Sequence, residues 1–189
     1  MKEPLTATSK NDPFKGAASF SLKHRLLRML WSIVWVFFAS WTPAPFHRWR
    51  VFLVNLFGAN VHKTAVIHNS TRIWYPPNLV MHEYACLGPR VNCYNMTLVT
   101  IGYKAIVSQD STLCAGTHDI NDPHFQLITK PITIGVGAWV AANAFIGPGV
   151  TVADSSVIGA CGVVFKSTEK NGVYGGNPAK LIKLREIHE

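Results

Sequence analysis

Charged side chains are scarce in this 189-residue chain, and acidic ones are the scarcest. Asp, Glu, Lys and Arg together make up 15% of the residues, with 10 acidic against 18 basic side chains and a formal net charge of +8 at pH 7. A hydrophobic content of 48% excludes an intrinsically disordered chain. The positive charge favours an anionic partner, but we expect no nucleic acid because no recognition motif for one accompanies the basic residues.

Cysteine is also rare, and its spacing excludes a metal framework. The chain has four cysteines, and none of them belongs to a CxxC pair. Paired spacings of that kind are typical of zinc sites and redox motifs. We therefore expect reduced core cysteines in a protein of the cytoplasm.

The leading segment lacks an apolar run long enough to cross a lipid bilayer. Its most apolar part, from Met29 to Trp41, carries no charge but falls short of the roughly 20 residues that a spanning helix needs. A cleavable signal peptide is not expected, because no small-residue cleavage site follows. The segment is therefore interpreted as part of the folded protein.

The same segment predicts two helices. Apolar side chains recur at spacings of three and four, at Leu22, Leu26, Leu30, Ile33 and Phe37. This spacing predicts one apolar helix face, and a second helix is expected from about Phe46 to Phe57, ending at Gly58. Basic and tryptophan side chains favour peripheral contact of residues 22–57 with the inner face of a membrane. Packing on a neighbouring subunit explains the pattern equally well.

A six-residue repeat fills most of the second half of the chain. An aliphatic residue opens each hexad, at Ile134, Val140, Ile146, Val152, Ile158 and Val164. Glycine or alanine follows it in all but the last, which suits three short strands per coil joined by tight corners. The repeat predicts an all-β solenoid, a parallel β-helix with inward ladders of aliphatic side chains.

Two interruptions divide the earlier hexads. One falls at Met96–Thr100, and a longer excursion spans residues 119–133. We expect an N-terminal extension with two apolar helices at 1–58, the β-helix at 59–175 and a tail at 176–189 that forms a short helix. Side chains beside the interruptions are the candidates for chemistry.

Five segments carry a resemblance to a known family. They are Gly116-Thr-His-Asp, Pro131-Ile-Thr-Ile-Gly, Gly137-Ala-Trp-Val-Ala, Gly147-Pro-Gly-Val-Thr-Val and Gly175-Gly-Asn-Pro-Ala-Lys. The chain resembles the hexapeptide-repeat sugar O-acetyltransferases, including the colanic acid or exopolysaccharide acetyltransferases and the maltose, galactoside and nodulation-factor branch. The resemblance implies a left-handed β-helix, a homotrimer with active sites at subunit interfaces, acetyl-CoA as donor, a saccharide acceptor and no metal. A lipid-linked acceptor is expected if residues 22–57 contact a membrane.

The resemblance also implies roles for three residues beside the interruptions. His118 matches the histidine that removes a proton from the acceptor hydroxyl, and imidazole titrates near working pH. Asn95 and Asp119 are expected to bind the acceptor, although both residue types also favour turns. No acyl-enzyme intermediate is required, so Cys114 need not act as a nucleophile.

The resemblance places the donor along the regular hexads. The residues that match its contacts with acetyl-CoA are Trp139, Ala142, Ala160, Lys166 and Lys183, with Lys180 nearby. Small side chains would admit the pantetheine, and lysines would neutralise its phosphates. Backbone amides of residues 137–142 are candidate donors to an oxyanion.

Three other functions stay open at this point. An N-acyltransferase acting on an amino or nucleotide sugar would use the same fold. A zinc-dependent hydratase similar to the hexapeptide-repeat carbonic anhydrases would need His82, His118 and His124 to converge. A non-catalytic β-helix subunit would use only its apolar helices, for assembly.

Overall fold

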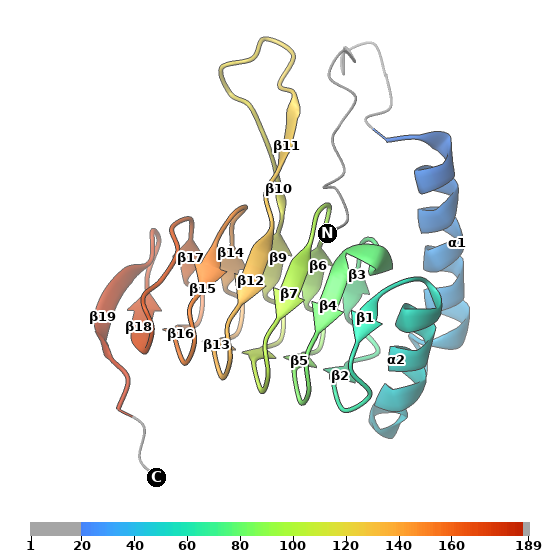
Figure 1. Ribbon diagram of the computed structural model, residues 1–189, viewed down its shortest axis with the longest axis horizontal. Helices are drawn as coiled ribbons and strands as arrows, with labels where there is room; N and C mark the ends of the chain where they lie inside the picture. The colour runs from blue at the N-terminus through green and yellow to red at the C-terminus, as the bar shows by residue number, and fades with distance from the viewer. Residues whose placement is uncertain (1–19, 187–189) are drawn as a thin grey trace.

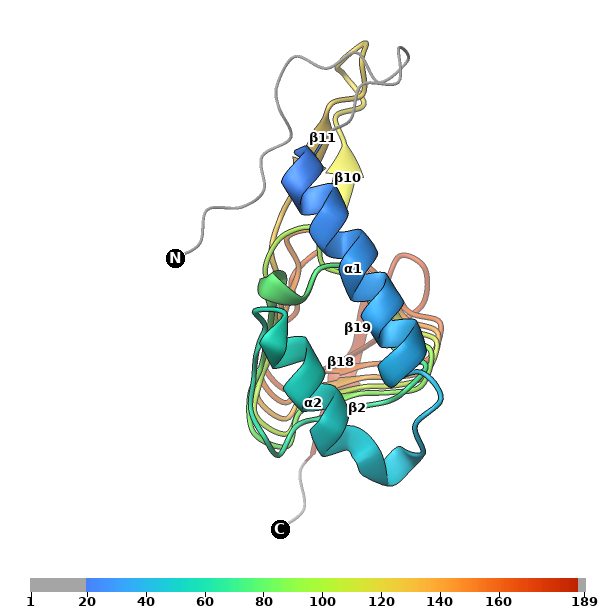
Figure 2. The ribbon, with the colours of Figure 1, turned by 90° about the vertical axis from the view of Figure 1, so that its right-hand side faces the viewer.

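The computed structural model describes residues 20–186, and it shows a β-solenoid of about six turns with helices at its N-terminal end (Figure 1). The predicted solenoid and N-terminal helices are confirmed. Each regular coil contributes one short strand to each of three parallel sheets, here called A, B and C, and the helices lie across the open first coil (Figure 2).

The strands of each sheet stack in the order of the coils. Sheet A contains β1 (Asn60–Val61), β4 (Leu79–Met81), β7 (Val99–Ile101), β12 (Ile132–Ile134) and β15 (Thr151–Val152). Sheet B contains β2 (Val66–Ile67), β5 (Cys86–Leu87), β8 (Ile106–Val107), β13 (Trp139–Val140), β16 (Val157–Ile158), β18 (Gly172–Gly175) and β19 (Lys180–Leu184). Sheet C contains β3 (Arg72–Ile73), β6 (Asn92–Tyr94), β9 (Thr112–Cys114), β14 (Phe145–Ile146) and β17 (Val163–Val164).

The core is the interior of the solenoid. The first residue of each hexad points inward and is at most 6% exposed; examples are Val61, Ile67 and Ile73 in the first coil and Ile134, Val140 and Ile146 in the fourth. Strand pairing aligns these residues from coil to coil, so they form continuous aliphatic ladders. This confirms the inward ladders that the repeat predicted.

The first two coils are longer than the regular one. Val61 pairs in register with Met81, and Met81 pairs with Ile101, whereas the regular coil runs only from Ile134 to its partner Val152. The additional residues lie between sheets C and A, where the short helix η3 (Pro76–Asn78) also forms. The corner between sheets C and A, here the C–A corner, is therefore the irregular corner of the solenoid.

Helix side chains close the open edge of the first coil. The helices are α1 (Leu22–Phe38) and α2 (His47–Leu56), connected through η2 (Ala44–Phe46). On sheet A, the Asn55 amide accepts from the Val61 backbone N–H at 2.9 Å and donates to its carbonyl at 2.8 Å. Capping by helices thus protects an edge strand that would otherwise present unpaired backbone groups.

The other two faces of the first coil are closed in the same way. On sheet C, the Trp31 indole N–H donates to the Ile73 carbonyl at 2.7 Å. On sheet B, Arg50 Nε donates to the Ile67 carbonyl at 2.6 Å, and the rest of its guanidinium bonds to the turn between the helices. Arg50 is 1% exposed, and burial lowers its pKa from the usual range. The apolar helices are therefore the end cap of the solenoid.

The predicted C-terminal helix is wrong. Residues Lys180–Leu184 form β19, which pairs antiparallel with β18. The last coil leaves β18 with a free edge, and pairing with β19 satisfies its backbone groups in a way that a helix could not. The expectation of core cysteines holds for Cys93, whose pKa burial raises to about 12, but Cys161 is exposed at a corner.

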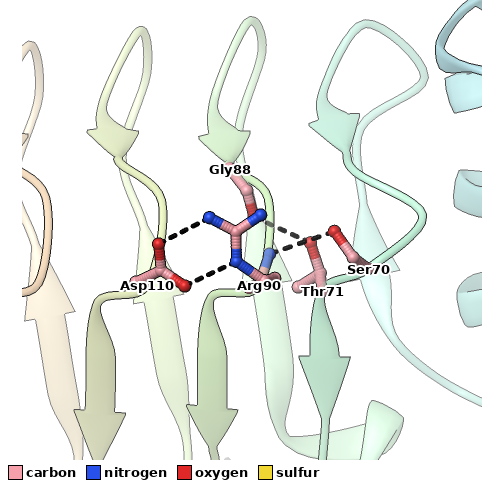
Figure 3. A network of polar contacts seen from close by, with 5 residues as sticks. All are labelled: Ser70, Thr71, Gly88, Arg90 and Asp110. Carbon is pink, nitrogen blue, oxygen red and sulfur yellow. Dashed lines mark hydrogen bonds and ion pairs between the residues drawn. The ribbon is translucent and has the colours of Figure 1, made fainter.

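Polar contacts connect successive coils at the corner between sheets B and C (Figure 3). The Arg90 guanidinium makes a bidentate ion pair with Asp110, with both N–O distances at 2.7 Å. The Arg90 backbone N–H donates to Ser70 Oγ at 3.1 Å, and Thr71 Oγ1 donates to the Gly88 carbonyl at 3.0 Å. Equivalent corners of neighbouring coils are therefore bonded to one another.

Candidate active site

A two-stranded ribbon leaves the solenoid at the C–A corner of the third coil. Strands β10 (Gly116–His118) and β11 (Leu127–Thr129) pair antiparallel, with His118 opposite Leu127. The ribbon projects away from the coils (Figures 1 and 2). It begins directly after β9 of sheet C and returns the chain to β12 of sheet A. The predicted excursion is thus an ordered hairpin that carries His118.

The two sequence interruptions meet at the base of this ribbon. A Cβ atom placed on Gly116 would collide with the Met96 sulfur, which belongs to the extra residues of the second coil. Met96 is buried, and its sulfur lies near the end of a flexible side chain that would have to shift. Glycine at position 116, shortly before the predicted base, therefore lets the ribbon lie against Met96.

The hydrogen bond of His118 defines which ring nitrogen is free. Nδ1 of His118 lies 2.6 Å from the Phe125 carbonyl oxygen. A carbonyl can only accept, so Nδ1 carries the proton in this contact. In the neutral imidazole the Nε2 lone pair is then available to take a proton. The side chain is exposed, as a group that meets a substrate must be.

Asp119 shapes the tip of the ribbon. Its Oδ1 accepts from the Asn121 backbone N–H at 3.0 Å, and its own N–H donates to the Gln126 carbonyl at 2.8 Å. These contacts make an Asx turn directly after His118. The predicted contact of Asp119 with the acceptor stays a prediction.

Asn95 is fully buried at the C–A corner of the second coil. Its Oδ1 accepts from the Tyr75 N–H at 3.0 Å, and its Nδ2 donates to the Tyr75 carbonyl at 2.7 Å. Asn95 therefore joins the first two coils at the corner that also carries His118. Its predicted role toward an acceptor is untested by these contacts.

The outer surface of sheet B is the regular wall of the solenoid. Trp139 projects from β13, is 46% exposed and donates its indole N–H to Ser108 Oγ at 2.8 Å. Ala142 and Ala160 lie on neighbouring coils at the corner between sheets B and C, where the Cys161 N–H donates to the Ala142 carbonyl. Because alanine carries only a methyl group, these side chains project little from the surface of this corner.

The predicted lysines lie in two places. Lys166 follows β17 of sheet C, so it lies on the C–A corner as His118 does. Lys180 and Lys183 lie on β19, at the end of sheet B, where Lys183 pairs with Val173. All three side chains are exposed. The structure thus groups His118 with Lys166, and it groups Trp139 with the alanines and the last two lysines.

The two groups face different directions. Sheet B is the side of the solenoid opposite the C–A corner, and the ribbon rises from the edge opposite β5 and β13 (Figure 1). The two groups of one chain therefore do not meet. The predicted oxyanion donors are also largely occupied, because the amides of Gly137, Trp139 and Ala141 donate to neighbouring coils.

Sequence reasoning missed the partner of His118. The partner is the backbone carbonyl of Phe125. Because every residue has a backbone carbonyl, the residue types in the sequence do not indicate this contact. For the zinc alternative, His82 lies at the corner between sheets A and B, away from His118. Within residues 20–186, no three His, Cys, Asp or Glu side chains are close enough together to hold a metal ion.

Comparisons with known proteins give the family. No protein-family model matches the chain. The chain is 44% identical over 156 residues to the "Putative colanic acid biosynthesis acetyltransferase WcaF" of Escherichia coli K12, and the match covers 82% of this chain and 86% of that protein. The chain belongs to the hexapeptide-repeat sugar acetyltransferase family. It is accordingly an enzyme, an acetyltransferase.

Solved structures show the same fold in other hexapeptide-repeat acetyltransferases. A maltose O-acetyltransferase from Clostridium difficile 630 superposes with a TM-score of 0.77 at 22% identity, covering 88% of this chain and 90% of that one. An acetyltransferase from Vibrio cholerae O1 biovar eltor, solved with acetyl-CoA, also has a TM-score of 0.77, at 20% identity and 90% and 93% coverage. At these identities the likeness shows the fold alone.

Proposed function

We propose that this acetyltransferase transfers an acetyl group from acetyl-CoA to a hydroxyl of a saccharide. The saccharide belongs to the assembly of colanic acid or a related cell-surface polysaccharide, and the reaction takes place on the cytoplasmic side of the membrane. The observation that supports it most is the contact of His118 Nδ1 with the Phe125 carbonyl, which leaves Nε2 as a base on an exposed ribbon. The relative at 44% identity supports the choice of acceptor class.

The proposed reaction needs one base and no covalent enzyme intermediate. His118 Nε2 takes the proton of the acceptor hydroxyl as that oxygen attacks the thioester carbonyl. The tetrahedral intermediate then collapses, the carbon–sulfur bond breaks, and the coenzyme A thiolate receives the proton from the imidazolium. The Phe125 carbonyl accepts from Nδ1–H and holds the ring in the tautomer whose Nε2 takes the proton.

The proposed site combines two copies of the chain. The C–A corner of one copy supplies His118 and Lys166, while the sheet B side of the next copy supplies Trp139, Ala142 and Ala160. A closed ring of three left-handed solenoids would give three such sites, in agreement with the homotrimer that the family resemblance implies. Lys180 and Lys183 would then meet the phosphates of the donor, with Asp119 at the acceptor end and the buried Asn95 beneath it.

The test is thioester consumption with acetyl-CoA against a panel of sugars, nucleotide sugars and amino sugars. The chain should turn over with a neutral saccharide, and His118→Ala should lower kcat by about 10²–10⁴-fold. His82→Ala, which changes a histidine at another corner, is the matched control and should keep its activity. Unchanged turnover by His118→Ala would overturn the mechanism, and acylation of amino sugars alone would show an N-acyltransferase.

A further inference from the structure

The outward side of α1 is a continuous apolar surface. Its buried side, with His24, Trp31 and Trp35, packs on the solenoid. The opposite side, here called the outer face of α1, consists of Leu22, Leu26, Met29, Leu30, Ile33 and Phe37. These six side chains are between 46% and 67% exposed, and their spacings of three and four place them on one stripe. The helix is therefore apolar on both sides, although only one of them meets the core.

The charge around this face has a single sign. No acidic residue occurs from position 20 to position 82, whereas Lys23, Arg25 and Arg28 lie within α1 itself. An amphipathic helix that is apolar on one stripe and basic beside it is typical of attachment to an anionic membrane surface. No helix within residues 20–186 has the length and apolar content needed to cross a bilayer.

A cleft of about 510 Å³ runs along one flank of α1, bordered by the outer face on one side and by Ile73 and Trp74 of the first coil on the other. Arg25 and Arg28 line it together with Leu22, Leu26 and Trp74. The Arg28 guanidinium lies 4.2 Å from the centre of the Trp74 ring, and its buried Nε makes no hydrogen bond in the described part of the chain. Two guanidinium groups beside apolar walls suit a phosphate that is attached to hydrocarbon.

A second copy of the chain fits this face less well than lipid does. Pairing the face with itself would bring the arginines and lysine of both copies together, and like charges at an interface oppose association. An anionic lipid surface supplies the opposite charge and covers the apolar stripe at once. We propose that the outer face of α1 docks on an anionic lipid bilayer, with a headgroup phosphate in the cleft between Arg25 and Arg28.

Vesicle flotation of the full-length protein tests this proposal without reference to catalysis. The probes are vesicles of pure phosphatidylcholine and vesicles in which phosphatidylglycerol replaces part of it, each with and without free inorganic phosphate. The protein should float with the anionic vesicles and bind the neutral ones at least tenfold more weakly, and free phosphate at millimolar concentration should not release it. Arg25→Gln should weaken the binding to anionic vesicles, because it removes one of the two guanidinium groups.

A pair of chemically identical substitutions separates this face from the rest of the surface. Ile33→Glu should lower anionic-vesicle binding at least tenfold. Ile182→Glu changes an exposed isoleucine on β19, at the other end of the solenoid, and should leave binding unchanged (Figure 1). The comparison is valid only if both variants keep the melting temperature of the wild type. If Ile33→Glu fails to fold, Leu26→Gln replaces it as an uncharged change on the same face.

Three results would overturn the proposal. The wild-type protein could fail to float with anionic vesicles, or both isoleucine variants could bind equally well. Alternatively, light scattering could show that Ile33→Glu splits an oligomer of a wild-type protein that does not bind lipid. That last result would assign the face to a contact between copies.

Discussion

The C–A corner and sheet B belong to the same coils but use their residues differently. Sheet B follows the hexad repeat, and its outward residues, such as Ile106 and Trp139, form a flat and mostly apolar wall. The C–A corner departs from the repeat in the first three coils and carries a histidine with one oriented nitrogen. In the proposed function, the regular repeat builds the surface on which the cosubstrate lies, and the interruptions add the base.

The largest change should follow from disturbing the corner. Gly116→Val would drive a side chain into the Met96 sulfur and displace the ribbon that carries His118. We expect a loss of about 1–3 kcal/mol in the free energy of unfolding, from overpacking. The turnover rate should fall by more than tenfold, because even a displacement of about 1 Å at a catalytic group is costly. Urea denaturation and steady-state kinetics measure the two effects.

A second substitution checks the cause. Met96→Ala combined with Gly116→Val removes the sulfur atom that the valine would meet. This double variant should recover part of the turnover lost in Gly116→Val alone. Met96→Ala alone is the control for the cavity it creates. If the double variant is no better than Gly116→Val, the contact between the two interruptions does not explain the need for glycine.

The smallest change should follow from removing the ion pair between Arg90 and Asp110, which joins two regular corners. The hydrogen bond from Arg90 lowers the pKa of Asp110 below the usual 3.8. A lowered carboxyl pKa in the folded state stabilises the protein above the ordinary pKa, and this contribution is lost as the pH falls through the lowered value. Arg90→Met should therefore lower the melting temperature slightly at pH 7, and the difference from wild type should disappear as the pH falls from the usual carboxyl pKa through the lowered one.

Asp110→Asn is the matched variant for this pair. It should reproduce the small difference at pH 7 and should leave turnover unchanged, because the pair is exposed to solvent on the second and third coils, whereas the proposed donor contacts Ala142 and Ala160 lie on the fourth and fifth. A large loss of activity in either variant would contradict the assignment of this network to coil stacking alone.

The sequence predicted the parts of the molecule that repeat. Inward residues such as Ile134 and Val140 were identifiable because a fixed period places an aliphatic side chain at every inward position. The ribbon with His118 was also predictable in outline, since it interrupts that period. The tautomer of His118 was not predictable, because its partner is a backbone carbonyl in a loop.

The ends of the solenoid were the hardest to predict. The helices were recognised from their apolar spacing, but their use as an end cap depends on single polar atoms of Arg50, Asn55 and Trp31. These side-chain atoms bond to backbone groups of the first coil. The two sets of atoms come close together only when the chain has folded. The tail forms a strand because the last coil has a free edge, which is a property of the assembled sheet and not of residues 180–184 alone.

We expect the C–A corner of one copy and the sheet B wall of another to make each active site. Co-expression of His118→Ala with Ala142→Arg tests it most directly, because the first variant lacks the base and the second blocks the wall. Each variant alone should be inactive. Random assembly of a closed ring should restore about a quarter of the wild-type activity, since half of the corners and half of the walls remain intact. A mixture as inactive as its parents would contradict the account and place the whole site within one chain.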